Sequence, residues 1–471
     1  MGLTIILLIA VSFLPDDISL FGIEIKPVDI LSDIRADEDE EYNDDYDYDE
    51  EDEDYYEDES NANHQSRNQL AAGLNFPLLP VKSINGFLEN SIPASSASIN
   101  SVQIKKEKIS GNVNQLSPFF DALKKADKIK LRIAHYGDSN IEGDLVTANI
   151  RDKLQKQFGG GGVGFLAITS QDIAFRITIH HTFSDDWRTA TVYTQNRENL
   201  AAGIKGEAFV NGRGSWVEYQ SRGEYETMRN FDLIRLFYSD AKETNVTFLI
   251  DGKTRQTGRL TDAKGLSELV IQTNNARSVK IEFPIKEQAN FYGVSLETEN
   301  GIYVDNFPLR GSTGAELIKI DSEQLKSFDD LLNYKLFIFE FGLNALNARY
   351  GNFNRYKREM IKVIEHYKSV FPKAGFLIIG AHDKSAKSGT KFMTDPIVYK
   401  LLEAQMEIAS ETGIAFWNLF QAMGGKDSMI NWVESNPPLA HKDFIHFNDL
   451  GSKKEAEMFS EALLDEYRNY K

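Results

Sequence analysis

Residues 129–144 read Ile-Lys-Leu-Arg-Ile-Ala-His-Tyr-Gly-Asp-Ser-Asn-Ile-Glu-Gly-Asp, and this stretch decides the fold. Its first half alternates apolar and polar residues, which predicts a short strand from Ile129. Residues 137–140 break that strand, and residues 145–158 carry apolar side chains at helical spacing. Ser139 is therefore expected on a tight turn between a strand and a helix.

Two roles are open for a serine in this place. A strand–turn–helix can present a nucleophilic hydroxyl at the C-terminal edge of a parallel sheet, where free helix amides can stabilise an oxyanion. The simpler role is that Ser139 caps the helix, which is what a serine before a helix most often does. The remainder of the chain is needed to choose between them.

The composition narrows the function classes. The chain has 471 residues, enough for two or three domains, and a formal net charge of −19. Residues 37–59 hold 17 acidic residues and no Lys or Arg, so removing these 17 charges leaves −2. The rest of the chain thus has no basic excess of the kind that binds nucleic acid. The absence of cysteine excludes thiol catalysis, thiolate metal sites and disulfides.

The first 110 residues are expected to lie outside the catalytic part. Residues 3–14 form an apolar run too short for a full membrane span, which favours an export signal or an anchor over a buried strand or helix. We therefore expect residues 1–35 to be a signal or anchor with a juxtamembrane segment. Residues 36–110 are expected to be an acidic disordered segment and linker. The predicted location is the periplasm or cell envelope.

The middle of the chain changes character. After the glycines of residues 159–164, which no Lys-Ser or Lys-Thr follows as in a phosphate loop, short alternating stretches recur, including residues 173–179, 216–219 and 246–250. Asp251-Gly252 is a hairpin signal. This pattern predicts a β-sandwich over residues 165–300, inserted between two parts of one α/β domain, 111–164 and 301–471.

From Gly301 onward, predicted strands alternate with helices, which indicates a parallel sheet covered on both faces. Ser139, Gly314 and Asn344 each follow a predicted strand, so they should meet at one edge of the sheet. Asp443 and His446 lie just before the last predicted helix. A serine, a histidine that accepts its proton and an acid that orients the histidine make a nucleophilic triad. Gly314, Asn344 and the Ser139 amide could bind the oxyanion.

These blocks, in this order, resemble the SGNH/GDSL hydrolase superfamily: Gly137-Asp138-Ser139, Gly314, Gly342-Leu343-Asn344 and Asp443-Phe444-Ile445-His446. The resemblance implies a flavodoxin-like three-layer α/β/α fold. It implies Ser139 as nucleophile, His446 as base and Asp443 as its partner, with Gly314 and Asn344 among the oxyanion donors. One position departs, because Ala345 stands where the third block usually continues with Asp. Gly311 competes with Gly314 for the second block.

A narrower resemblance is to envelope peptidoglycan O-acetylesterases, in which a β-sandwich similar to carbohydrate-binding modules is inserted after the serine block. It covers residues 130–465 and implies removal of the acetyl group from the C6 hydroxyl of N-acetylmuramic acid. No metal or organic cofactor is expected, and the expected partner is an acetylated polysaccharide. Alternatives are a polysaccharide O-acetyltransferase with the same acyl-enzyme, a non-catalytic glycan-binding envelope protein, and an acidic surface-display protein.

Other histidines and aromatic residues have simpler interpretations. His135 is expected to pack at the strand end and His441 to be structural. The His180-His181 pair is expected to be exposed and polar, and His382-Asp383 is a candidate for a loop that contacts substrate. Three aromatic residues of the predicted sandwich are more often core than sugar-stacking: Trp187, Trp216 and Tyr219.

Overall fold

The computed structural model describes residues 18–20, 23–25, 106–193, 200–283, 288–347 and 352–470. The chain divides into two compact units, Met1–Pro93 and Ala94–Lys471. In the first unit the described residues form one antiparallel pair, β1 (Ile18–Leu20) with β2 (Ile23–Ile25). The predicted signal or anchor run and the acidic segment lie outside the described residues. Within the described ranges, no helix combines the length and apolar character that crossing a bilayer requires.

The second unit is built around a sheet of five parallel strands. Its order is β16-β4-β17-β18-β21, with the short strand β3 added antiparallel at the edge. The strand bounds are β3 (Ser110–Gly111), β4 (Lys130–Gly137), β16 (Gly301–Pro308), β17 (Tyr334–Glu340), β18 (Gly375–Ile379) and β21 (Ala415–Trp417). Counted along the chain, the parallel order is 2-1-3-4-5, which is the flavodoxin-like order.

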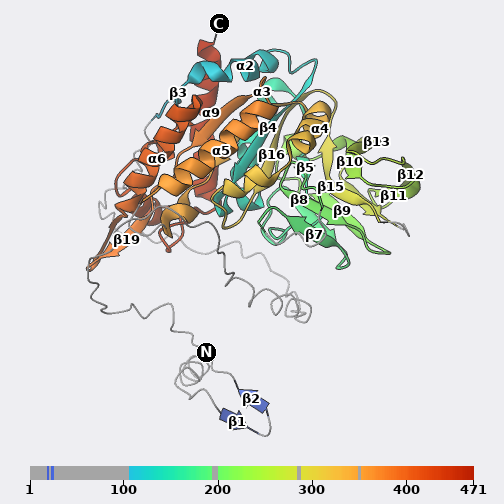
Figure 1. The fold of residues 1–471 in the computed structure, drawn as a ribbon, viewed down its shortest axis with the longest axis horizontal. Helices are drawn as coiled ribbons and strands as arrows, with labels where there is room; N and C mark the ends of the chain where they lie inside the picture. The colour runs from blue at the N-terminus through green and yellow to red at the C-terminus, as the bar shows by residue number, and fades with distance from the viewer. Residues whose placement is uncertain are drawn as a thin grey trace, which may run out of the picture. The chain divides into compact units, whose positions relative to one another are not determined.

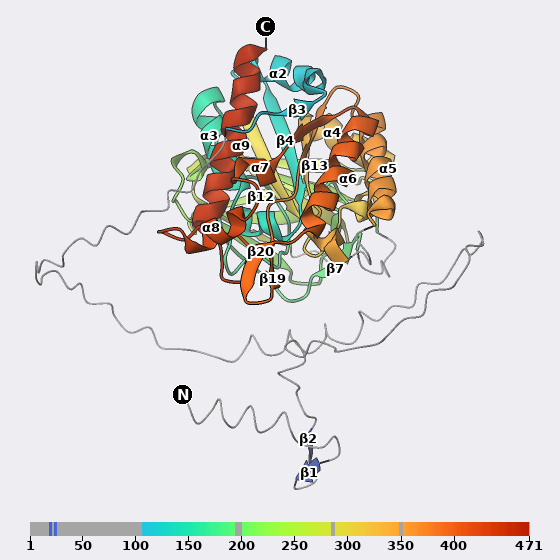
Figure 2. The same ribbon diagram turned by 90° about the vertical axis from the view of Figure 1, so that its left-hand side faces the viewer.

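Helices cover both faces of this sheet (Figures 1 and 2). Alternate residues of β4 point to opposite faces: Ile133 packs in a core with α2, α3 and α9, and Tyr136 packs in a core with α4, α5 and α6. The helix bounds are α2 (Ser117–Leu123), α3 (Thr147–Phe158), α4 (Ser322–Leu332), α5 (Asn354–Val370), α6 (Ile397–Thr412), α7 (Leu419–Ala422), α8 (Ser428–Glu434) and α9 (Asp449–Asn469). The predicted three-layer α/β/α architecture is confirmed.

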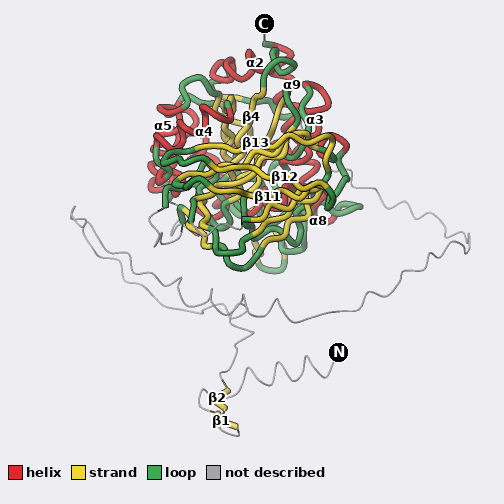
Figure 3. Tube along the Cα trace, turned by 90° about the vertical axis from the view of Figure 1, so that its right-hand side faces the viewer, coloured by secondary structure: helices red, strands yellow, loops and turns green. Residues whose placement is uncertain are grey.

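Between α3 and β16 the chain forms two antiparallel sheets (Figure 3). One has the order β13-β10-β15-β8-β7 with β5 beside β15, and the other has the order β12-β11-β14-β9-β6. Their bounds are β5 (Gly164–Leu166), β6 (Ile179–Phe183), β7 (Arg188–Thr191), β8 (Glu207–Val210), β9 (Trp216–Ser221), β10 (Phe231–Ser239), β11 (Thr244–Ile250), β12 (Thr254–Leu260), β13 (Ser267–Ala276), β14 (Ser278–Glu282) and β15 (Asn290–Glu297). Apolar residues of both sheets share one buried core. The exact domain boundaries remain predictions.

Two local expectations differ from the structure. Residues 139–144 form a 3-10 turn, η2 (Ser139–Asp144), before α3 begins at Thr147. Residues 173–178 are not a strand, and β6 begins only at Ile179. The reason is that the polar residues here bond to buried partners outside any sheet: Arg176 pairs with Asp172, and Thr178 donates to Asp144. Alternation alone therefore suggested a strand where the chain turns.

A buried ion cluster joins the antiparallel sheets to the α/β sheet. Arg132 of β4 lies 2.7 Å from Asp305 of β16 and also pairs with Glu297 of β15. Its guanidinium donates to Ser295 at 2.7 Å as well. Burial works to lower the pKa of Arg132, but the carboxylates of Asp305 and Glu297 outweigh it and raise that pKa well above the ordinary value. The side chains of the cluster therefore stay charged, and their ion pairs join the antiparallel sheets to the α/β sheet.

Candidate active site

The loops that carry Ser139, Gly314 and Asn344 leave three neighbouring strands at the same level. Gly137, at the end of β4, is paired with Pro308 of β16 on one side and with Glu340 of β17 on the other. Because the three strands are parallel, their C-terminal ends lie at one edge of the sheet. This edge includes the boundary between β4 and β17, where the strand order reverses and ligands bind in such sheets.

The turn after β4 resolves the two roles that the sequence left open for Ser139. The residue that caps η2 is Asp138, whose Oδ1 accepts the Asn140 N–H at 3.0 Å. The capping function is thus supplied by the preceding aspartate, and the cap interpretation of Ser139 is wrong. Ser139 is half-buried at the first position of the turn, which leaves its hydroxyl free of capping.

Asp443 and His446 form the expected pair. His446 Nδ1 lies 2.8 Å from Asp443 Oδ2, while Asp443 Oδ1 accepts the backbone N–H groups of Ile445 and His446 at 2.9 and 3.1 Å. Burial works to raise the pKa of Asp443, but the hydrogen bond from His446 and the two backbone bonds lower it. The carboxylate therefore stays charged and orients the ring with Nδ1 toward it, which leaves Nε2 to accept a proton.

No hydrogen bond of the described residues joins the Ser139 hydroxyl to the His446 ring. Burial raises the pKa of the Asp138 carboxyl, next to Ser139, to about 7. The helix that follows His446, α9, contacts the serine turn, since Glu455 Oε2 lies 3.3 Å from Asn140 Nδ2. Catalytic hydrogen bonds often tighten only when substrate binds.

The predicted oxyanion donors both contact Ser312. The Gly314 N–H donates to Ser312 Oγ at 2.8 Å, and the Asn344 side chain donates to Ser312 O at 3.0 Å and to Asp138 Oδ2 at 3.3 Å. Gly314 caps η4 (Ala315–Lys319) in a left-handed conformation, with φ +92°. The structure thus brings the two residues together beside the serine turn. Their role as oxyanion donors, which requires each to give up one of these bonds, remains a prediction.

Ala345, the departure from the usual third block, lies in η5 (Leu343–Asn347) and is buried in the core that covers one face of the sheet. Its backbone N–H donates to Gly342 O at 2.9 Å. Packing and a backbone bond therefore hold the loop that carries Asn344.

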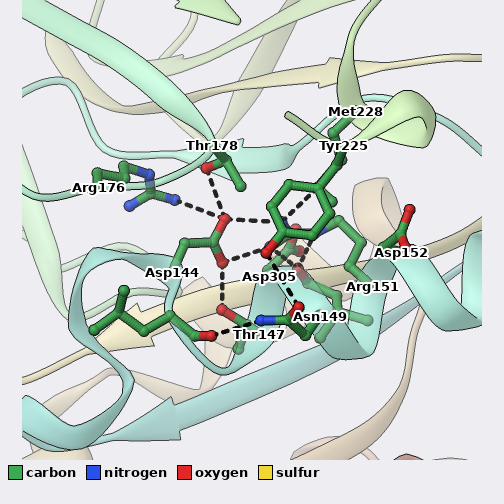
Figure 4. Close-up of polar contacts among 12 residues, drawn as sticks. Asp144, Thr147, Asn149, Arg151, Asp152, Arg176, Thr178, Tyr225, Met228 and Asp305 are labelled. Atoms are coloured by element: carbon green, nitrogen blue, oxygen red, sulfur yellow. Dashed lines mark hydrogen bonds and ion pairs between the residues drawn. The ribbon is translucent and has the colours of Figure 1, made fainter. Parts of the chain in front are cut away.

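Beyond Ser139, the turn ends in a buried polar cluster (Figure 4). Asp144, with φ +64°, accepts hydrogen bonds from Arg151 at 2.8 and 3.0 Å and from Thr178 at 2.8 Å, and pairs with Arg176 at 3.7 Å. Burial works to raise the pKa of Asp144, but Arg151 and Arg176 outweigh it and lower that pKa. Because Arg176 and Thr178 come from the inserted region, that region helps to fix the serine turn.

Several residues that shape this edge were not predicted from the sequence. Phe444, between Asp443 and His446, has φ +59° and stacks on Phe392 with ring centroids 3.9 Å apart. Phe392 belongs to a hairpin of β19 (Ser385–Ser388) and β20 (Lys391–Thr394). Glu340 and Glu455 lie beneath the turn and bond Asn140. The acid that ends β17 was visible in the sequence beside the third block, but nothing there indicated its partner in α9.

The remaining histidines have structural contacts. His135 is buried and bonds Glu340 at 2.9 Å. His181 is buried rather than exposed: its ring stacks on Tyr219 and bonds Ile168 O, and burial lowers its pKa to about 4. His382 is 3% exposed and packs on Phe447, which does not fit a side chain that contacts substrate. The backbone N–H of His441 donates to His446 O at 2.9 Å.

Of the three aromatic residues considered for sugar stacking, Tyr219 is fully buried. Trp187 packs edge-on against Phe283 and Phe291. Trp216 is half-buried, with Lys280 over its ring. The described ranges contain no group of three or more His, Asp or Glu side chains that could hold a metal ion.

Comparison with known proteins agrees with this geometry at the level of the fold. No protein-family model matches the chain, and no curated protein matches it. Among solved structures, the likeness is one of fold, and it is to an esterase. A peptidoglycan O-acetylesterase structure matches with a TM-score of 0.63 and 22% identity over 77% of this chain and 99% of that one. Two weaker matches follow. The salicylyl-acyltransferase SsfX3 matches with a TM-score of 0.29 and 13% identity over 64% of this chain and 97% of that one. A family two carbohydrate esterase from Cellvibrio japonicus matches with a TM-score of 0.26 and 10% identity over 62% of this chain and 98% of that one.

Proposed function

We propose that this chain is a serine esterase that removes O-acetyl groups from a cell-wall or surface polysaccharide, with peptidoglycan as the first candidate. The observation that carries the proposal is the His446–Asp443 pair, in which Nδ1 lies 2.8 Å from the carboxylate. Ser139 stands on the turn at the switch point of the sheet, and its hydroxyl is not needed as a cap because Asp138 caps that turn. The peptidoglycan substrate is supported by the fold likeness to a peptidoglycan O-acetylesterase.

The reaction follows from the roles of these side chains. The Ser139 oxygen attacks the acetyl carbonyl carbon while His446 Nε2 accepts the hydroxyl proton, and Asp443 stabilises the imidazolium. Gly314, Asn344 and the Ser139 amide donate to the oxyanion. The C–O bond to the sugar then breaks, and the leaving alkoxide takes the proton from His446. Water, activated by the same ring, hydrolyses the acetyl-enzyme to acetate and restores Ser139.

Acetate release tests the proposal directly. The purified chain is incubated with O-acetylated peptidoglycan, O-acetylated xylan and a lipid ester, and free acetate is measured for the wild type and for S139A. We expect release from peptidoglycan first, and none from any substrate with S139A. Equal activity of S139A and wild type would refute the nucleophile. Release from xylan alone would move the substrate away from peptidoglycan, and acetyl appearing on an added sugar acceptor would indicate a transferase.

The place of action is part of the proposal. The apolar run of residues 3–14 suits an export signal or an anchor, and an acetylated envelope polysaccharide is found outside the cytoplasm. Fractionation of cells that express the tagged full chain should recover it in the envelope or periplasmic fraction. Recovery in the cytoplasmic fraction alone would contradict export.

A further inference from the structure

Four polar side chains lie directly beneath the serine turn, and the proposed reaction does not use them. They come from different elements: His135 from β4, Asn140 from η2, Glu340 from the end of β17 and Glu455 from α9. All are buried, and His135 and Glu455 are 0% exposed. The cluster therefore connects the strand before Ser139, the strand before Asn344 and the helix that follows His446.

Glu340 is at the centre of this cluster. Its Oε2 lies 2.9 Å from His135 Nε2, and its Oε1 lies 2.6 Å from Asn140 Nδ2. Glu455 Oε2 lies 3.3 Å from the same Asn140 nitrogen. Two carboxyl groups, one from the end of β17 and one from α9, thus share one amide group in a buried space.

Two buried carboxyl groups that bond the same amide nitrogen do not both stay ionised, because each charge disfavours the other and burial disfavours both. Burial raises the pKa of Glu455 well above its ordinary value, and the charge of Glu340 raises it further. Burial also works to raise the pKa of Glu340, but hydrogen bonds from His135, Asn140 and Glu455 outweigh it, and that pKa is lowered. The negative charge therefore resides on Glu340 and the proton on Glu455.

We propose that Glu455 and Glu340 are a shared-proton pair that positions the serine turn, with the Glu455 hydroxyl donating to Glu340 and Glu340 holding the Asn140 side chain next to Ser139. Three donors then converge on one carboxylate, from β4, η2 and α9. Other titratable groups act on the pair: Asp138 acts on Glu455, His135 bonds Glu340, and His382 interacts with the charge of Glu340. Neither glutamate touches substrate in this arrangement, so both are positioning residues.

The kinetic consequences rest on the proposed esterase function, and three variants test them. E455Q keeps a donor toward Glu340, so its kcat should stay within about twofold of wild type. E455A removes the donor and should lower kcat at least tenfold with little change in KM, so that glutamine rescues what alanine loses. E340Q replaces the carboxylate that accepts these hydrogen bonds with an amide, and it should lower kcat at least tenfold. As the pH is raised through the titration of Glu455, kcat of the wild type should fall, and E455Q should lack that fall.

The proton itself can be observed without any activity. In D2O at neutral pH, the infrared difference spectrum of wild type minus E455Q should show the C=O stretch of a neutral carboxylic acid, while circular dichroism confirms that both proteins are folded. That band with no esterase activity would leave the pair standing and refute the function. A missing band, or an E455Q that loses kcat as E455A does while folded, would overturn the proposal.

Discussion

The stacked pair of Phe392 and Phe444 should control how often His446 and Asp443 are correctly placed. Phe444 has φ +59°, a conformation that costs a bulky residue about 1–2 kcal/mol. It is retained by the ring of Phe392, parallel to within 13° at 3.9 Å, and by the Ser385 N–H, which donates to Phe444 O at 3.1 Å. An aromatic pair contributes about 0.5–1.5 kcal/mol beyond area burial.

The F392A change removes that contribution while leaving the core intact, since Phe392 is already 41% exposed. A loss of about 0.5–1.5 kcal/mol shifts the loop equilibrium by about 2–12-fold, at about 1.4 kcal/mol for each tenfold. We therefore expect kcat for a chromogenic acetate to fall by about 2–10-fold with KM nearly unchanged. Y399A is the matched control, because Tyr399 is 44% exposed and packs on Phe420 instead of the catalytic loop.

A double-mutant cycle separates the stack from any general effect of the hairpin. Glycine at position 444 relieves the positive φ and removes the ring, so F392A in the F444G background should cause no further loss of kcat. Two outcomes would refute the reasoning: F392A has the same kcat as Y399A, or F392A lowers kcat equally in the wild-type and F444G backgrounds. Either would mean that the stacked rings do not position the His446–Asp443 pair.

Three further outcomes are expected. D443N should lower kcat by about 10–100-fold, and the control D449N should not. Two charges 4 Å apart attract by about 4 kcal/mol at an effective dielectric of 20, and water weakens this attraction because about half of the Asp443–His446 pair is exposed. R132M should lower the free energy of unfolding, measured in urea, by about 3–5 kcal/mol, because it leaves buried carboxylates unpaired. The control R255M, at the exposed Arg255–Glu282 pair, should lower it by less than about 1 kcal/mol. The pKa of His181 is about 4 in the folded state against an ordinary 6.5, so between pH 6.5 and 4 the unfolded state binds more protons than the folded state. The free energy of unfolding therefore falls as the pH is lowered through this range. H181Q should show a smaller fall over the same range, and an unchanged dependence on pH would contradict this.

The α/β fold could be predicted from the sequence because its signals are local. The alternation of strands and helices predicted from Gly301 onward is observed. The strand β18 (Gly375–Ile379) and the helix α6 (Ile397–Thr412) are examples, since a short apolar run and helical periodicity each identify their element without knowledge of its neighbours. The alternation at residues 173–178 does not form a strand, because Arg176 bonds Asp172 four residues earlier and Thr178 bonds Asp144, 34 positions away. The second bond has no local sequence pattern.

In the candidate site, one contact follows from a local signal. Asp443 and His446 are three residues apart, so their pairing could be anticipated and the structure confirms it. A capping role for Ser139 is a reasonable expectation from sequence because serine often precedes a helix. The structure gives that role to Asp138, the residue before it. The contact of Glu455 with Asn140 spans 315 positions and has no sequence signature.

The separation between Arg132 and Asp305, 173 positions along the chain, has a consequence for biosynthesis. During translation β4 emerges long before β16, its neighbour in the sheet, so its flank stays unpaired until the intervening strands have been made. Closing so distant a pairing is slow, and an open strand flank invites association with other chains. Ribosome-bound intermediates that stop short of Gly301 should therefore depend on chaperones, and activity should appear only after the last helix has left the exit tunnel.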